Sequence, residues 1–350
     1  MSLLFSPLTL GSVTLRNRVI VSPMCQFCAE DGLVNDWHLV HLGSRAVGGA
    51  GLVIVEATSV TPEGRITPWD LGLWSDAQAR AFEPVTRFLT QQGAVPGLQL
   101  AHAGRKASMD RPWGAGEWIP PARGGWEPMG PSPEPFAPGY GTPHAMTTAQ
   151  IDGVVDAFAA ATRRALGAGF RVIEIHMAHG YLLHQFLSPL VNRRTDAYGG
   201  NFENRIRLPL RVVEAVREAW PEQLPLFLRI SATDWVEGGW DLPQSVLLAR
   251  AVKERGVDLV DCSSGGAVAG AQTPLAPGYQ VPFAAAIRQE ARIATGAVGL
   301  ITEPEQAEGI LARGEADAVL LGRELLRQPY WPLHAARALG VDIPWPVQYL

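Results

Sequence analysis

The amino-acid sequence predicts a (β/α)8 barrel, the TIM-barrel architecture, formed by residues 1–350 as a single domain. Eight short apolar runs rich in branched residues alternate with longer segments of helical periodicity. With 47% hydrophobic residues, the chain can bury a large core. The alternative is a doubly wound open sheet, but its usual G-x-G-x-x-G fingerprint is missing after the first run. The same absence argues against a Rossmann-type dinucleotide site.

The elements follow one another in a regular order. Residues 8–19 predict a short N-terminal hairpin around Gly11-Ser12. The predicted strands are 19–24, 51–58, 95–101, 172–178, 225–231, 257–263, 296–301 and 317–322. The predicted helices are 76–92, 147–168, 202–219, 243–255, 282–291, 303–313 and 329–339.

One connection is much longer than an ordinary barrel loop. Residues 103–146, after the third strand, are crowded with glycine, proline and tryptophan. Because loops that follow barrel strands lie at the C-terminal mouth, we expect this excursion to cap the active site. The alternative is a surface excursion that only packs on itself.

Composition excludes several function classes. The net charge is −5 and no basic run occurs, which argues against nucleic acid and anionic membranes as partners. No apolar run approaches the roughly 20 residues needed to span a bilayer, and we expect no signal peptide. Three cysteines in a chain of this length predict a reducing, cytoplasmic setting.

The most informative stretch is 172–200, where a buried strand leads into His176, His179 and Tyr181. Parallel α/β proteins present their chemistry at this end of a strand. Three other interpretations stay open at this point. They treat the histidines as core residues bonded to backbone carbonyls, as ligands of a metal-dependent hydrolase together with His102, or as part of a non-catalytic binding barrel.

The period-two alternation of the strands predicts which side chains face the barrel axis. In strand 225–231 it sends Arg229 inward, and in the neighbouring strands it sends Gln99, Glu174 and His176 inward. A buried arginine keeps its proton, so it needs an anionic partner or a ligand. The alternative is an internal Glu174–Arg229 ion pair that only stabilises the lumen.

The last strands carry features of a phosphate site. Ser263-Ser264-Gly265-Gly266 follows the sixth strand, the seventh contains Gly296 and Gly299, and the eighth ends in Gly322-Arg323. Glycines let backbone N–H groups approach an anion, and an arginine adds charge-assisted hydrogen bonds. Together they predict a phosphorylated ligand.

Several motifs resemble those of the Old Yellow Enzyme family of FMN-dependent ene-reductases, and more narrowly its bacterial thermophilic-like class. They are SPMCQF (22–27), EAT (56–58), QLAHAGRKA (99–107), HMAHGYLLHQFLSPLVNRRTDAYGG (176–200), GAVGLI (296–301) and LGR (321–323). The resemblance runs from about residue 3 to 340, and the 176–200 block is its most specific part.

The resemblance implies FMN at the barrel mouth. It places Gln99 at the pyrimidine edge of the flavin and Arg229 near N1 and O2. It lines the ring with Ser22, Pro23, Met24 and Ala57, and it assigns the phosphate to Gly299, Gly322 and Arg323. Cys25 matches the cysteine that this class holds near flavin and substrate.

The resemblance also implies a ping-pong mechanism and no metal. NADPH or NADH reduces the flavin and leaves, and an activated alkene such as an enone then enters the same site. His176 and His179 donate hydrogen bonds to its carbonyl oxygen, the flavin delivers hydride to the β-carbon, and Tyr181 protonates the α-carbon. Lys106 matches a family lysine, which we expect to shape the substrate mouth or to meet a nicotinamide-cofactor phosphate.

Three features depart from the family pattern. Phe27 stands where the family usually has tyrosine, so we expect an altered substrate preference. Cys28 is unusual, and an oxidised Cys25–Cys28 pair is a hypothesis that thiol titration tests. The C-terminus lacks the arginine that often reaches a neighbour's active site, although Tyr349 offers a substitute. We expect a homodimer or homotetramer.

Overall fold

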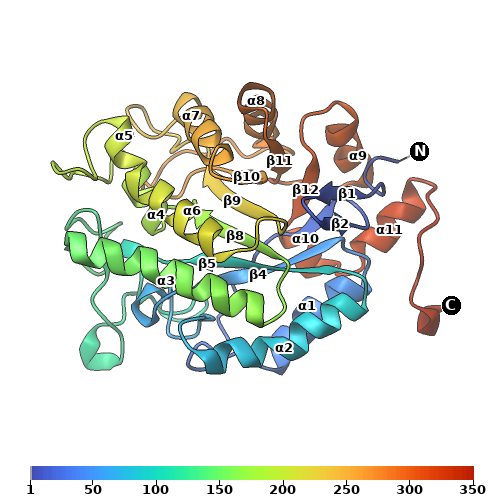
Figure 1. Ribbon diagram of the computed structural model, residues 1–350, viewed down its shortest axis with the longest axis horizontal. Coiled ribbons are helices and arrows are strands. Elements are labelled where there is room, and N and C mark those ends of the chain that lie inside the picture. Colours follow the sequence, from blue (N-terminus) through green and yellow to red (C-terminus); the bar gives the residue numbers. More distant parts are fainter. Residues whose placement is uncertain (1) are drawn as a thin grey trace.

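The computed structural model describes residues 2–350 and confirms the barrel. Eight parallel strands close in the spatial order β10-β11-β12-β3-β4-β5-β8-β9 (Figure 1). Their bounds are β3 Val19–Val21, β4 Leu52–Ser59, β5 Val95–Ala101, β8 Val172–Met177, β9 Leu226–Ser231, β10 Leu259–Ser263, β11 Ala294–Ala297 and β12 Ala318–Leu321.

Helices surround the strands (Figure 1). They are α1 Asp36–Val47, α2 Asp76–Gln91, α3 Thr148–Gly167, α4 Leu182–Leu187, α5 Phe202–Arg205, α6 Arg207–Ala219, α7 Leu242–Lys253, α8 Val281–Ala291, α9 Pro304–Ala312, α10 Arg323–Arg327 and α11 Trp331–Ala338. In residues 2–350, no helix is both long and apolar enough to cross a membrane.

The structure corrects two predicted elements and adds three helices that the sequence analysis did not predict. The seventh strand ends at Ala297, because the left-handed backbone of Gly299 (φ +123°) and Leu300 (φ +50°) turns the rest of the apolar run into a loop. The predicted helix 202–219 is two helices that meet at Ile206. Helices α1, α4 and α10 were not predicted, although Asn35 caps α1 by accepting a hydrogen bond from the Trp37 N–H.

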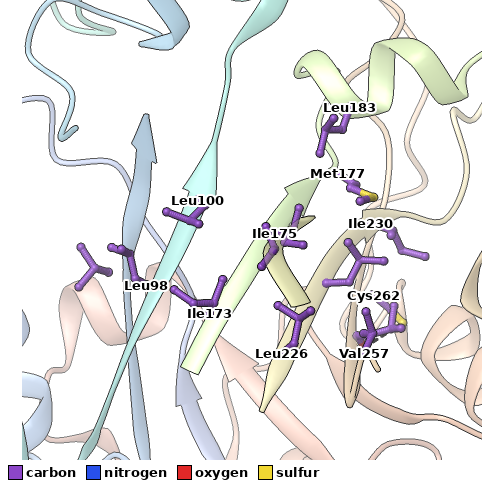
Figure 2. Packing of buried hydrophobic residues seen from close by; sticks show 14 of the residues in the cluster. Leu98, Leu100, Ile173, Ile175, Met177, Leu183, Leu226, Ile230, Val257 and Cys262 are labelled. Carbon is purple, nitrogen blue, oxygen red and sulfur yellow. Dashed lines mark hydrogen bonds between the residues drawn. The ribbon is translucent and has the colours of Figure 1, made fainter. Parts of the chain in front are cut away.

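The strand alternation builds two separate cores. Outward side chains such as Leu98, Ile175 and Leu226 belong to the cluster between strands and helices (Figure 2). A smaller cluster fills the barrel lumen, and the antiparallel hairpin of β1 (Leu8–Leu10) and β2 (Val13–Leu15) packs Leu15 against it. Burial of each such side chain contributes about 1.5–3 kcal/mol. The lumen is therefore filled at its hairpin end, and polar chemistry is left to the opposite end.

The 103–146 excursion carries the short parallel pair β6 (Met129–Gly130) and β7 (His144–Ala145). It packs on itself, since the Trp118 indole donates a hydrogen bond to the Trp126 carbonyl (3.1 Å). It also reaches the mouth, where Trp113 meets Phe27 edge-on with ring centroids 5.9 Å apart. The segment thus has contacts within itself and a contact with the barrel mouth, and its role as a cap stays a prediction.

Candidate active site

A cavity of about 410 Å³ opens at the C-terminal ends of the barrel strands. Most predicted site residues line it, namely Ser22, Pro23, Met24, Cys25, Phe27, Ala57, Gln99, His176, His179, Tyr181, Arg229, Gly322 and Arg323. Gly299 lines an adjoining cavity of about 200 Å³, which shares Arg229, Gly322 and Arg323 with the first. Lys106 lines neither cavity.

The polar floor of the cavity comes from inward positions of β5, β8, β9 and β10. Arg229 lies directly opposite Asp261 in the register of β9 and β10, with 2.9 Å between Arg229 Nε and Asp261 Oδ2. Glu174 accepts a hydrogen bond from the Gln99 amide at 2.7 Å. The alternative of an internal ion pair therefore named the wrong acid, because the carboxyl group that meets Arg229 is that of Asp261. Asp261 was missed, although the same alternation places it inward between Leu259 and Ser263.

The two buried carboxyl groups of the floor compete for one cation. Burial, together with the negative charge of Asp261, raises the pKa of Glu174 to about 8, against the lowering effects of Arg229 and of the Gln99 hydrogen bond. Burial also raises the pKa of Asp261 to about 6, against the lowering effect of Arg229. Because like charges at close range disfavour joint ionisation, Asp261 carries the negative charge near pH 7 while Glu174 stays protonated.

His176, His179 and Tyr181 cluster above this floor. The His176 ring centroid lies 5.2 Å from that of His179 and 5.1 Å from that of Tyr181. Burial, reinforced by the charge of Arg229, lowers the pKa of both histidines well below the ordinary value, so both imidazoles are neutral. Burial raises the pKa of the Tyr181 phenol well above 10, so it keeps its proton. The cluster can donate hydrogen bonds without carrying charge.

The turn that carries His179 and Tyr181 is fixed by side chains from other elements. His179 (φ +59°) and Gly180 (φ +72°) both have left-handed backbone, a conformation that costs about 1–3 kcal/mol for a non-glycine residue. The His179 N–H donates to Ser231 Oγ (2.9 Å), and the Gly180 N–H donates to His184 Nδ1 (2.9 Å). The Gln185 amide donates to the Gly180 carbonyl (2.8 Å).

Lys106 completes this framework. Its ammonium donates to the carbonyls of His179 (2.8 Å) and Gly266 (2.5 Å) and lies 3.9 Å from the Phe136 ring centroid. Burial lowers the pKa of Lys106 to about 7, and the nearby charge of Arg105 adds to this effect. The sequence singled out Lys106 for the substrate mouth, whereas its contacts tie the turn after β8 to the loop after β10.

Behind the turn lies a buried pair that sequence reasoning missed. His184 Nε2 lies 2.9 Å from Asp234 Oδ1, and neither side chain is exposed. The other carboxylate oxygen of Asp234 accepts from Ser188 Oγ (2.6 Å) and from the Trp240 N–H (2.9 Å). Ser263, which the sequence analysis grouped with the phosphate features, has its hydroxyl 2.7 Å from His179 Nε2, and this contact was not foreseen. Only the resemblance block at 176–200, which contains His184, pointed toward this region.

The adjoining cavity has the shape of an anion cradle. A Cβ on Gly299 would lie 2.9 Å from Gln280 Nε2 and 3.0 Å from the Tyr279 ring, so a larger residue would fill the space. Gly322 faces open space, with Met24 Sδ at 3.7 Å as the nearest atom to a built Cβ. Arg323 begins α10 and lines both cavities. Glycine backbone beside an arginine suits a phosphate group.

The opposite wall of the cavity is formed by residues 22–28. Glu56 Oε2 accepts the Gln26 N–H (2.8 Å), and Glu56 Oε1 lies 3.4 Å from His38 Nε2. Cys28 Sγ lies 3.6 Å from the same His38 nitrogen, and both Cys25 and Cys28 are free thiols. The hypothesis of an oxidised pair therefore has no support in this structure.

The metal-dependent alternative requires a converging ligand set. Within residues 2–350, no group of three His, Cys, Asp or Glu side chains is close enough to hold a metal ion. His102, one of the proposed ligands, instead accepts a hydrogen bond from the Gly104 N–H at 3.0 Å through Nδ1.

Comparison with known proteins gives a consistent picture. A model of the NADH:flavin oxidoreductase / NADH oxidase family matches residues 3–341. The chain is 51% identical to an NADPH dehydrogenase of Geobacillus sp. (strain WCH70), over 99% of this chain and 98% of the relative. Among solved structures, morphinone reductase is similar with a TM-score of 0.80 and 31% identity, over 99% of this chain and 91% of that one. An old yellow enzyme homologue from Zymomonas mobilis has a TM-score of 0.80 and 28% identity, over 98% and 94% of the two chains.

Proposed function

Because the chain belongs to the NADH:flavin oxidoreductase / NADH oxidase family, we propose that it is an FMN-dependent ene-reductase of the Old Yellow Enzyme type. The family and the relatives named NADPH dehydrogenase make it an oxidoreductase that uses FMN and a nicotinamide reductant. The proposal adds the substrate, an activated alkene such as an enone, and a ping-pong order in which both substrates use one site.

The residues of the two cavities fit FMN. The larger cavity offers apolar and sulfur-bearing side chains for a planar ring, and the adjoining one offers the glycine and arginine cradle for a phosphate. His176 Nδ1 and Glu174 Oε2 are buried and have no hydrogen-bond partner within residues 2–350, so polar capacity remains at the cavity floor. When bound, FMN supplies the hydride chemistry.

Individual roles follow from position. Gln99 and Arg229 hold the polar edge of the ring, and the Arg229 charge favours negative charge there. Ser22, Pro23, Met24, Cys25 and Ala57 flank the ring. Gly299, Gly322 and Arg323 hold the phosphate.

The neutral His-His-Tyr cluster is the observation that carries the alkene-reduction step. His176 and His179 donate hydrogen bonds to the substrate carbonyl oxygen, which stabilises the negative charge that develops there. Tyr181, which stays protonated because it is buried, gives its proton to the α-carbon. Phe27, on the opposite wall, contacts the substrate without a hydrogen bond.

The test separates the two half-reactions. Purified protein should be yellow, bleach with NADPH under anaerobic conditions, and regain colour when an enone is added. Tyr181→Phe should bleach normally but recolour about 10²–10⁴ times more slowly, because it lacks the acid. Colourless protein with stoichiometric zinc would refute the proposal. A panel of enones with NADPH and NADH defines the substrate range.

The oligomeric state stays a prediction of a homodimer or homotetramer. Tyr349, which the sequence analysis offered as a substitute for the missing arginine, has its hydroxyl 3.0 Å from that of Tyr330 in its own chain. Sedimentation velocity of the wild type measures the state directly.

A further inference from the structure

The carboxyl groups of Asp261 and Glu174 have no role in the function proposed above. Both side chains are completely buried on the floor of the larger cavity, and Asp261, Arg229 and His176 lie directly opposite one another across β10, β9 and β8. The floor thus holds two acids and one guanidinium group immediately beneath the residues that line the cavity. A fold that only needed to anchor one arginine would require a single carboxylate.

The hydrogen bonding of this cluster is incomplete. The 2.9 Å contact from Arg229 Nε to Asp261 Oδ2 is close but poorly directed, so neither atom has hydrogen-bond geometry. Asp261 Oδ1 and Glu174 Oε2 also have no partner within residues 2–350. Because local dipoles do not fully compensate the charges, and because water does not screen buried groups, their field extends into the cavity.

We propose that Asp261, backed by Glu174, is a counter-charge to Arg229 that lowers the reduction potential of the bound flavin. This inference rests on the proposed placement of FMN over Arg229. Reduction adds negative charge to the flavin, which a cation beneath the ring favours and a carboxylate beneath it opposes. Asp261 is thus a tuning residue that acts through the electrostatic field, without contact with the substrate.

The second carboxyl makes the effect non-additive. With Asp261 ionised, Glu174 stays protonated. When the charge at position 261 is removed, Glu174 loses its repulsive neighbour and keeps the attraction of Arg229, so it ionises and partly restores the negative charge. Only removal of both carboxyl groups leaves Arg229 without a counter-charge.

The experiment measures the potential of FMN in the holoenzyme at pH 7 against a reference dye, for wild type, Glu174→Gln, Asp261→Asn and the double variant. Glu174→Gln should match the wild type, Asp261→Asn should shift to a moderately more positive potential, and the double variant should shift furthest. When the dye holds the solution at one fixed potential, the ratio of reduced to oxidised FMN should be about tenfold or more higher in the double variant than in the wild type. The double effect should exceed the sum of the single effects.

A role of Asp261 in merely aiming Arg229 predicts the opposite result. If Arg229 were no longer oriented toward the flavin, the potential would stay unchanged or become more negative. Either outcome in the double variant overturns the inference. Cys262→Ala is the matched control, because Cys262 is the buried neighbour of Asp261 on the outward face of β10, and its potential should stay at the wild-type value. Thermal melts and FMN content identify any variant that fails to fold, and in that case the single Asp261→Asn variant decides by the sign of its shift. Failure of the proposed function would look different, since no enone would then reoxidise the reduced wild-type FMN, while the potentials of all variants could still be measured.

Discussion

The two side walls of the cavity differ in how many of their backbone groups are hydrogen-bonded by side chains. In the turn after β8, every backbone N–H and C=O of His179 and Gly180 is bonded by a side chain of another element. In the wall at 22–28, the residues from Pro23 to Cys28 are half-buried and fewer of their backbone groups are bonded. The Gln26 N–H donates to Glu56 (2.8 Å), and the Cys28 carbonyl accepts from Asn35 (2.8 Å). The wall to which we assign the proposed acid and carbonyl donors is thus held in place by side chains from several elements. The departures from the family, Phe27 and Cys28, both lie in the less constrained wall.

Breaking the support of the fixed wall should have the largest effect. His184→Leu removes the acceptor of the Gly180 N–H and leaves the buried Asp234 carboxylate without its imidazole partner. A buried ionised group that loses a partner is destabilised at the upper end of the range for an unsatisfied polar group, about 3 kcal/mol, which urea denaturation measures. Turnover should fall as well, because the backbone of His179 and Tyr181 is no longer fixed.

Ser188→Ala is the matched control for this change. It removes one donor to Asp234 and leaves the His184 contact in place, so we expect a loss of about 1–2 kcal/mol. Equal losses in the two variants, or a loss below about 1 kcal/mol in His184→Leu, would show that the pair is not what holds the turn.

The carboxyl groups behind the two walls should also differ in their pH dependence. Burial raises the pKa of Asp234, but bonds from His184 and Ser188 leave it lowered overall, so its stabilisation is present above about pH 4 and is lost at lower pH. Asp70, near the other wall, has its pKa raised to about 7 by burial, although Thr67 lowers it. Between about pH 4 and 7 the native state therefore holds a proton at Asp70 that the unfolded state has released.

For Asp70→Asn, the sign follows from this linkage. The wild type loses stability relative to the variant as pH rises from about 4 to 7, by up to about 4 kcal/mol, and the variant shows a flatter profile over that window. Urea denaturation at several pH values measures both curves. A difference that stays constant across the window would mean that Asp70 is ionised in the native state throughout.

How much of this was predictable depended on the range of the interactions. Strand alternation alone placed Gln99, Glu174, His176 and Arg229 correctly, because period two fixes the face of each residue once a strand is recognised. The partners were less accessible, since Asp261 and Glu174 lie on different strands and only the three-dimensional register decides which one meets Arg229. The supports of the turn were the least predictable. Ser231 and Lys106 are distant in sequence, and His184 lies in the unpredicted helix α4.

A smaller change should restore the family residue in the less constrained wall. Phe27 lines the cavity, contacts Trp113 edge-on and has left-handed backbone (φ +52°), which tyrosine can occupy equally well. Phe27→Tyr should leave reduction by NADPH unchanged and shift relative kcat/KM among enones by about tenfold or less, because one added hydroxyl offers one new hydrogen bond. Unchanged kinetics across the whole panel would refute a role for position 27 in substrate preference.

The smallest effect concerns the thiols of the same wall. Burial raises the pKa of Cys28 to about 11, and the charge of Glu56 adds to this effect. At pH 8 the thiolate fraction should therefore be about 0.1%, against roughly a quarter for an ordinary cysteine, so alkylation of Cys28 by iodoacetamide should be slower than in the unfolded chain by about 200-fold. Glu56→Gln is the matched variant, and its Cys28 should be alkylated faster because the charge that opposes the thiolate is removed.

Mass spectrometry of the modified peptides follows each cysteine separately, and thiol titration should count three thiols both before and after reductant is added. Fast labelling of native Cys28 would mean that this wall holds a reactive thiol. Two thiols that appear only after reduction would mean that it holds an oxidised cysteine pair, so that a disulfide would constrain this wall after all.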